Sequence, residues 1–314
     1  QIDLFAKHLK GIKSVAVYGG ANISTQISQL KRPRHVVIAT PGRLIDLVKR
    51  KALKLDQIKY LVLDEADEML NMGFKDELDT ILEFTPDSKK TWLFSATMPR
   101  EIRRMVKQYM ESPFEVSVDP KTTVNANIEH KYAIVKQSDK TEAMGRFLEL
   151  EPDLYGVVFC RTRRDTQALA EDLLKMGFRA DALHGEMSQP QRDRVMNRFK
   201  NRDLQVLVAT DVAARGIDVN ELTHVFHHSL RSEQAYYTHR SGRTARAGRK
   251  GISLAFISNR EKGYINRMAR EMDISFEAVD VPGAEEIVQA RMMKWASDVL
   301  DQKAFDRVPF DLIM

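Results

Sequence analysis

Short apolar runs alternate with amphipathic segments along most of the chain, and this alternation sets the expected fold. Strands are expected at residues 14–18, 35–39, 60–63, 91–94, 156–160, 179–183, 205–209, 223–227 and 252–257. Several intervening segments have the periodicity of helices, among them residues 44–51, 76–84, 164–176 and 189–200. Apolar runs of this length joined by helical segments predict right-handed βαβ crossovers and an α/β fold with mostly parallel sheets.

The alternation lapses once, in a polar segment that separates two similar halves. We interpret residues 119–129 as a linker between one domain at residues 1–118 and a second at residues 130–260. Residues 261–314 form an extension in which Ile265, Met268, Met292 and Trp295 recur at helical spacing. We expect amphipathic helices there that pack on the second domain. An accessory module for a homodimer or for RNA remains the alternative.

Composition narrows the class of protein. A chain of 314 residues accommodates two domains, and 43% hydrophobic with 30% charged residues is typical of a globular protein. The net charge of +5 allows a polyanionic partner without requiring one. The single cysteine, Cys160, excludes an internal disulfide and fits a reducing compartment. No apolar run has the roughly 18 residues of a membrane helix, so no membrane association and a cytoplasmic location are expected.

The apolar run at residues 60–63 ends abruptly in Asp64-Glu65-Ala66-Asp67. Carboxylates at the carboxyl end of a buried parallel strand lie where α/β folds bind ligands. Oxygen ligands of this kind suit Mg²⁺ shared with the phosphates of a nucleotide, and a second carboxylate there orients an attacking water. A solvated acidic cap on the following helix is the alternative for this stretch on its own.

Other predicted strand ends carry small, hydroxyl or basic residues. The first strand ends in Gly19-Gly20 and the second in Thr40-Pro41-Gly42-Arg43, where a helix N-terminus and an arginine would suit an anion. The strand after Asp64 ends in Ser95-Ala96-Thr97, whose hydroxyls could hydrogen-bond the carboxylates or a phosphate. Each of these turns is also compatible with simple helix capping.

Residues 239–250 contain five Arg or Lys, one His and no acid. If this run is helical, Arg243 and Arg246 share a face because they are three residues apart. Paired guanidinium groups suit a polyphosphate or a nucleic-acid backbone. The alternative, a solvated basic helix, loses weight because Gly242, Ala245 and Gly248 would let another surface approach the backbone closely.

These motifs, in this order and spacing, resemble those of a DEAD-box ATP-dependent RNA helicase of superfamily 2. The resemblance covers roughly residues 1–260 and includes the stretches Gly19-Gly20, Thr40–Arg43, Asp64–Asp67, Ser95–Thr97, Ala209–Asp218 and His239–Gly248. Six motifs in order, each at a predicted element edge, are far more specific than any one of them. The C-terminal extension is similar to the bacterial cold-shock branch of these helicases.

The resemblance implies two RecA-like domains that clamp ATP and RNA and unwind short RNA duplexes locally, with little sequence preference. Asp64 would hold Mg²⁺ through water and Glu65 would position the hydrolytic water. Arg243 and Arg246 would be arginine fingers and Asp218 would contact the ATP ribose. Coupling between the domains would involve Asp67, Ser95, Thr97 and His239. RNA contacts would come from Gly20, Gly42, Arg43, Gln189, Arg192, Thr210 and Gly216.

The chain departs from the family pattern in two places. The family's glutamine motif, its Gly-Lys-Thr phosphate loop and its Pro-Thr-Arg-Glu-Leu segment are absent, and the 314 residues contain no Gly-Lys dipeptide. We therefore expect an N-terminally truncated helicase with an incomplete first domain, inactive alone. His227-His228-Ser229 stands where the family usually has an Asn-Tyr-Asp segment. A non-catalytic RNA-binding remnant and a DNA-directed helicase remain alternatives.

Overall fold

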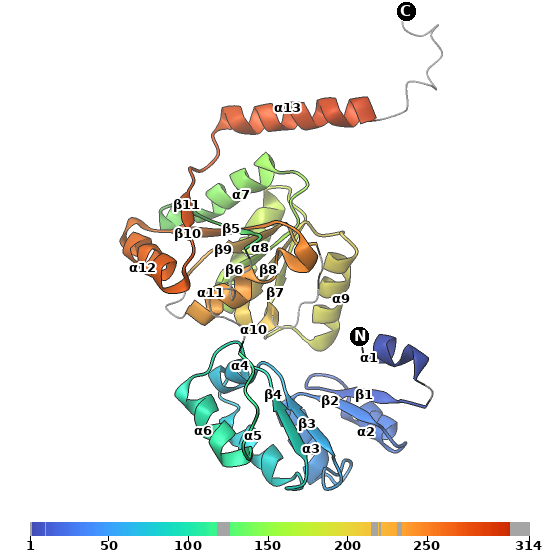
Figure 1. Ribbon diagram of the computed structural model, residues 1–314. Helices are drawn as coiled ribbons and strands as arrows, with labels where there is room; N and C mark the ends of the chain where they lie inside the picture. The colour runs from blue at the N-terminus through green and yellow to red at the C-terminus, as the bar shows by residue number, and fades with distance from the viewer. Residues whose placement is uncertain are drawn as a thin grey trace, which may run out of the picture. The chain divides into compact units, whose positions relative to one another are not determined.

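The computed structural model describes residues 2–9, 11–117, 126–214, 219, 221–230 and 234–301 (Figure 1). Two compact units make up the chain, Gln1–Ser117 and Val118–Met314. All strand pairs among the described residues are parallel. The predicted α/β class with parallel sheets is therefore confirmed.

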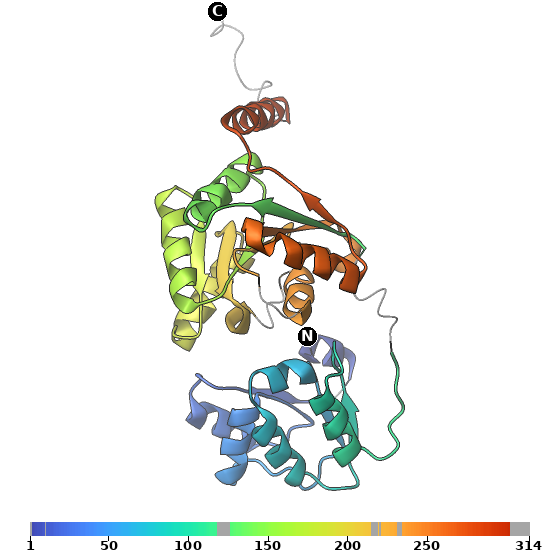
Figure 2. The ribbon, with the colours of Figure 1, turned by 90° about the vertical axis from the view of Figure 1, so that its left-hand side faces the viewer.

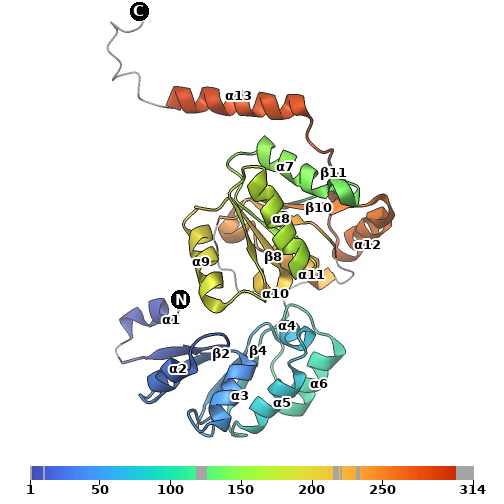
Figure 3. The same cartoon turned by 180° about the vertical axis from the view of Figure 1, so that it is seen from behind.

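The first unit contains two separate two-stranded sheets. In one, β1 (Ser14–Val17) pairs with β2 (Val36–Ala39), and in the other β3 (Tyr60–Leu63) pairs with β4 (Lys90–Leu93). Its helices are α1 (Ile2–Phe5), η1 (Ala6–His8), α2 (Ile23–Leu30), α3 (Pro41–Lys49), α4 (Ala66–Asn71), α5 (Lys75–Glu83) and α6 (Arg100–Tyr109). Figure 3 shows α3 and α5 side by side, consistent with the contacts between them.

Each small sheet has its own core and leaves strand residues exposed. Val15, Val17 and Leu47 form one buried cluster. Leu63, Leu78, Leu82 and Met105 form another. Meanwhile Tyr60, Val62 and Trp92 are 60%, 53% and 54% exposed, although each lies within a strand. These strands are thus covered on one face only.

The second unit is built on one seven-stranded sheet of order β11-β5-β10-β9-β6-β8-β7. Its strands are β5 (Ile128–Ile134), β6 (Gly156–Cys160), β7 (Ala180–Leu183), β8 (Val206–Thr210), β9 (His224–His227), β10 (Gly251–Ile257) and β11 (Phe276–Ala278). Its helices are η3 (Gln137–Asp139), α7 (Lys140–Leu150), α8 (Arg163–Lys175), α9 (Gln189–Lys200), α10 (Asp211–Ala214), α11 (Gln234–Ser241), η4 (Arg246–Gly248), η5 (Asn259–Glu261), α12 (Lys262–Met272) and α13 (Ala284–Asp301).

Helices cover both faces of this sheet (Figure 2). Val158 and Cys160 of β6 face the cluster that includes Met144 and Leu173 from α7 and α8. The alternate residues of β6 face a second cluster, which contains Phe199 from α9. All residues of β6, β8 and β9 are buried. Near-continuous apolar strands are the pattern expected when both faces of a parallel sheet are covered.

Several elements were not anticipated from the apolar pattern, among them α6 in the first unit and α7, β5 and β11 in the second. Helix α7 and strand β5 precede the first strand expected in the second half, and β5 begins at Ile128, inside the segment interpreted as a linker. Residues 119–125 of that segment lie outside the described residues. Strand β11 comes from the extension and pairs with β5. Residues of the extension therefore complete the sheet of the second unit.

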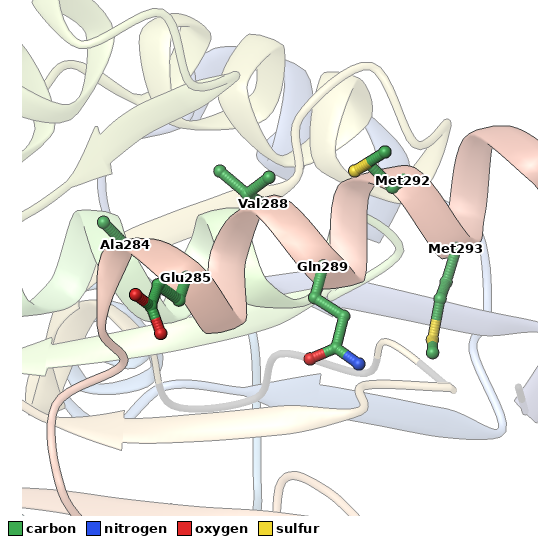
Figure 4. Close-up of a pocket in the computed structure, with 6 residues that line it drawn as sticks. All are labelled: Ala284, Glu285, Val288, Gln289, Met292 and Met293. Atoms are coloured by element: carbon green, nitrogen blue, oxygen red, sulfur yellow. The ribbon is translucent and has the colours of Figure 1, made fainter.

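The two helices of the extension pack differently. In α12, Ile265 and Met268 are buried against the sheet, as predicted. In α13, Ile287 is buried, but Met292 and Trp295 are 66% and 70% exposed, so packing of its whole apolar face was wrongly predicted. Figure 4 shows Val288, Met292 and Met293 on this helix beside a shallow open groove. Among the described residues, no helix is long and apolar enough to cross a membrane.

Candidate functional site

The acidic stretch lies at the carboxyl end of β3, as the apolar pattern predicted. Asp64 and Glu65 are exposed, while Asp67 is buried in the first turn of α4. Glu65 adopts a left-handed backbone conformation with φ 51° and ψ 47°, which is uncommon for a non-glycine residue. The next amide, of Ala66, donates to the Phe94 carbonyl at 3.0 Å. This sharp turn presents two carboxylates to solvent at the edge of the sheet.

Asp67 is the centre of a hydrogen-bonded group that joins the ends of β3 and β4. Its Oδ2 accepts from the Thr97 amide at 2.9 Å and from Thr97 Oγ1 at 2.7 Å. Its own amide donates to Ser95 Oγ at 3.2 Å, and Ser95 Oγ donates to the Thr97 carbonyl at 2.6 Å. The structure therefore brings Asp67, Ser95 and Thr97 together. Movement of either strand end would be transmitted to the other through these bonds.

Asp64 borders a hollow of about 920 Å³ within the first unit. Tyr18, Asn22 and Gln26 also line it, and Gln26 Oε1 is a buried acceptor without a hydrogen-bond partner. A hollow of this size lies in the range of small-molecule sites. No group of three or more His, Cys, Asp or Glu suited to a metal occurs in the part of the chain that the structure describes. An exposed single carboxylate fits Mg²⁺ held through water, which takes most of its ligands from water and phosphate.

Arg43 holds the glycine loop of the first unit. Both terminal nitrogens of its guanidinium, Nη1 and Nη2, donate to the Ala21 carbonyl at 3.2 Å. Gly20, just before Ala21, has φ 80°, a conformation in which a side chain would be strained. Gly42 is exposed in the first turn of α3, and open space surrounds the position of its missing Cβ. Gly20, Gly42 and Arg43, predicted separately from two motifs, thus lie close together.

In the second unit, the predicted RNA residues follow two neighbouring parallel strands. Thr210 ends β8, and β7 leads into α9, whose first turn carries Gln189 and Arg192. Gln189 Nε2 donates to Asp193 Oδ1 at 2.8 Å. Arg192 is partly buried, and its Nε has no hydrogen-bond partner. The predicted residues Gly216 and Asp218 lie outside the described residues.

The basic run does not form the continuous helix expected from its spacing. Helix α11 ends at Ser241, Ala245 is left-handed with φ 56°, and Arg246 begins η4. Arg243 and Arg246 therefore do not share one helix face, and that prediction is wrong. Thr244 is buried, and its hydroxyl donates to the Leu222 carbonyl. This bond holds the turn after α11 against the body of the second unit. Gly251 makes this approach possible, because a Cβ there would lie 2.1 Å from Thr244 Oγ1.

The two arginines bond back to their own segment. Arg243 Nε donates to the His239 carbonyl at 3.3 Å, and Arg246 Nε donates to the Gly242 carbonyl at 3.1 Å. Both side chains are partly exposed, and His239 is partly buried on α11. The guanidinium groups are thus held near the turn after α11 while keeping access to solvent.

The sequence reasoning missed a buried ion pair beneath this turn. Arg240 is 2% exposed, and its Nε and Nη2 donate to the two carboxylate oxygens of Asp211 at 2.5 and 2.8 Å. Its Nη1 donates to the Ser229 carbonyl at 2.8 Å. The sequence did offer one signal for this pair, because Asp211 is an acid directly after the end of β8 at Thr210. Nothing in the spacing distinguishes Arg240, which points inward, from its exposed neighbours.

A buried polar network continues from α11 into the sheet. Tyr237 Oη lies 2.7 Å from His130 Nδ1 and 3.2 Å from Ser253 Oγ. Ser253 Oγ also lies 3.0 Å from His227 Nε2. Burial lowers the pKa of His130 to about 4 and that of His227 well below its ordinary value. His227, one of the residues that depart from the family pattern, therefore stacks neutral on Tyr237.

Comparison with known proteins agrees with this arrangement. Residues 1–105 match the model of the DEAD/DEAH box helicase family, and residues 139–248 match that of the helicase conserved C-terminal domain. The ATP-dependent RNA helicase CshA of Limosilactobacillus reuteri is 40% identical over 92% of this chain and 58% of its own length. DeaD of Buchnera aphidicola is 40% identical over 95% of this chain and 50% of its own. The chain thus spans about half the length of the curated relatives it matches.

Solved structures of RNA-bound relatives also superpose on this chain. S. cerevisiae Dbp5 bound to RNA and ADP BeF3 superposes with a TM-score of 0.83 at 27% identity, over 94% of this chain and 76% of that one. Mss116p bound to ssRNA and AMP-PNP gives 0.78 at 30% identity, over 91% of this chain and 61% of that one. The relatives named CshA and DeaD agree with the cold-shock branch expected from the extension. The chain belongs to the DEAD-box RNA helicase family.

Proposed function

We propose that these two units are the catalytic core of an ATP-dependent RNA helicase that unwinds short RNA duplexes locally. Closure of the two domains around ATP and RNA would bend one strand out of the duplex, and hydrolysis would reset the clamp. The protein would act in the cytoplasm, on RNA of little sequence preference. The observation that carries this proposal is the hydrogen-bonded group of Asp67, Ser95 and Thr97 beside exposed Asp64 and Glu65.

In this proposal each exposed carboxylate has a separate task. Asp64 holds Mg²⁺ through water, and the ion supplies neutralisation of phosphate charge when bound. Glu65 orients the water whose oxygen attacks the γ-phosphorus as ADP leaves. The left-handed backbone at Glu65 supports this role, because strained, solvent-exposed residues of this kind are often found at active sites. Asp67 has no such freedom, since Thr97 binds its carboxylate.

The second unit supplies positive charge and the ribose contact. Arg243 and Arg246 stabilise the transferring phosphoryl group, and Asp218 contacts the ribose. Buried Asp211 and Arg240 support this role by fixing the last turn of α11, from which the basic segment emerges. His239 takes part in contacts between the domains. Arginine fingers of this kind contribute about 10³- to 10⁵-fold to hydrolysis.

RNA would be held by its backbone in both units. Gly20, Gly42 and Arg43 form one contact group, and Gln189, Arg192, Thr210 and Gly216 form the other. Accessible glycine amides and arginine side chains recognise phosphate and sugar, which carry no base information. Residues 1–314 contain no Gly-Lys dipeptide. We therefore propose that this chain alone lacks the family's phosphate loop and does not hydrolyse ATP.

The test is RNA-stimulated ATP hydrolysis by the full-length protein carrying Glu65→Gln. Hydrolysis should fall by about 10²- to 10⁴-fold while ATP and RNA affinities stay close to those of the wild type. Glu83→Gln is the matched control, since Glu83 is an exposed glutamate of the same unit. Near-normal turnover of the Glu65 variant would remove this residue from the proposed role.

Two alternatives are separated by the same assay. A non-catalytic RNA-binding remnant would show RNA binding without hydrolysis in the wild type as well. A DNA-directed helicase would respond to DNA at least as strongly as to RNA. Proteins whose structures superpose on this chain are described as bound to RNA or ssRNA, which supports RNA as the activator.

A further inference from the structure

Helix α6 of the first unit carries a stripe of four cations that the proposed site does not use. Arg100, Arg103, Arg104 and Lys107 are all exposed. With 3.6 residues per turn, the four lie within about 100° of the helix circumference. The opposite side carries Ile102 and Met105, which are buried in the unit's core. The helix is therefore fixed by its apolar side, and its outward face is mainly positive, with Glu101 as its exposed acid, at the periphery of the unit (Figure 1).

This stripe is an unfavourable arrangement for the isolated protein. The four side chains form like-charge pairs at i,i+3 and i,i+4 spacing, which repel one another. Arg100 and Arg103 lie in the first turns, where the helix dipole also disfavours a cation. Among the residues that the structure describes, no acid forms an ion pair with any of the four. A local conflict of this kind is typical of a functional surface.

We propose that this face of α6, which we name the α6 stripe, binds the phosphate backbone of RNA outside the contact groups assigned above. This inference rests on the proposed RNA-directed function. The stripe is about 10.5 Å long at 1.5 Å per residue. The rise of about 3.4 Å per phosphate is measured along the duplex axis, and neighbouring phosphates of one strand are further apart in space, so the stripe spans about two to three successive phosphates. Three of the four cations are arginines, whose planar donors suit phosphate oxygens.

The test compares two variants that lose the same charge. One replaces the α6 stripe with glutamine, and the control replaces four exposed cations scattered over the same unit, Arg32, Lys49, Lys54 and Lys59. RNA affinity of the full-length protein is measured as a function of salt for the wild type and both variants. Loss of two to three phosphate contacts reduces the magnitude of the slope of log K against log salt by about 1.4 to 2.1 for a single strand, and affinity falls at least about tenfold. The control should change the slope by less than about 1.

The outcomes separate this inference from the proposed function. If the wild type binds no RNA, the RNA-directed function itself fails, and the inference with it. If the wild type binds RNA and the α6 variant matches the control, the stripe is a solvated face or serves another polyanion, and only the inference is overturned. The α6 variant should unfold at the same temperature as the wild type or higher, because repulsion is removed. Should it aggregate, Arg103→Gln with Arg104→Gln tests the same claim, with about half the change in slope.

Discussion

The two units use similar strand–helix alternation but differ in how completely their sheets are formed. In the second unit seven strands make one sheet, and β6, β8 and β9 are buried throughout. In the first unit four strands make two separate pairs, and Tyr60 and Trp92 are more than half exposed. Equal sequence periodicity therefore does not imply equal stability, because the free energy of burial comes from neighbours on both faces of a strand.

The difference in sheet completeness should appear most strongly as unequal protection of backbone amides from hydrogen exchange. Backbone amides of β6 and β8 should exchange about 10⁴-fold more slowly than those of β1 and β3 in residues 1–314, corresponding to about 5.5 kcal/mol of opening free energy. Amide exchange followed by mass spectrometry measures this, and limited proteolysis should cut the first unit sooner. Equal protection in both units would show that two small sheets suffice for a stable domain.

Loss of an ion pair should destabilise the second unit more than the first, because the pairs compared are buried in one and exposed in the other. Arg240→Met in the second unit leaves Asp211 buried without its guanidinium and should destabilise that unit by about 3 to 5 kcal/mol. The matched control is Arg50→Met in the first unit, where the Asp46 pair is 2.7 Å long but largely exposed. That change should cost less than about 1 kcal/mol. Urea denaturation of each variant gives both numbers, and similar costs would contradict the role assigned to burial.

Acid should weaken the second unit selectively. Burial lowers the pKa of His130, His224 and His228 to about 4, whereas an unfolded histidine titrates near 6.5. The unfolded chain then binds more protons, so stability is present above about pH 6.5 and is lost as the pH falls toward 4. The three shifts together should cost about 5 kcal/mol between pH 7 and pH 5.

The first unit provides the contrast for this pH effect. Its two histidines, His8 and His35, are exposed, whereas the histidines named above are buried in the second unit. Urea midpoints between pH 7 and 5, with unit-specific exchange as the readout, measure the difference. His228→Asn should flatten the slope for the second unit, and an unchanged slope would exclude His228 as a contributor.

Sequence reasoning was most successful where one strand end carries one kind of chemistry. The bounds of β6 and the exposed position of Asp64 follow from local pattern, because an apolar run and its polar end are adjacent in sequence. The turn at Ala245 was missed because it depends on Thr244 reaching the Leu222 carbonyl, 22 residues away. Strand β11 was missed because three residues at a sheet edge give too short a signal. Arg240 was missed because burial, not residue type, separates it from Arg243.

The smallest effect concerns one threonine hydroxyl group in each unit, Thr97 and Thr244. Thr97→Val removes one of two Thr97 donors to Asp67, but the amide bond at 2.9 Å remains, so the buried carboxylate stays partly satisfied. The cost should be about 1 to 2 kcal/mol for the first unit. RNA-stimulated hydrolysis by the full-length protein should fall by more than this loss of stability explains.

The matched control is Thr244→Val in the second unit, which removes the bond to the Leu222 carbonyl at similar cost. Stability measured by urea denaturation, together with turnover, separates the two. If hydrolysis in the Thr97 variant followed stability alone, the hydroxyl would be a structural contact and not a coupling one.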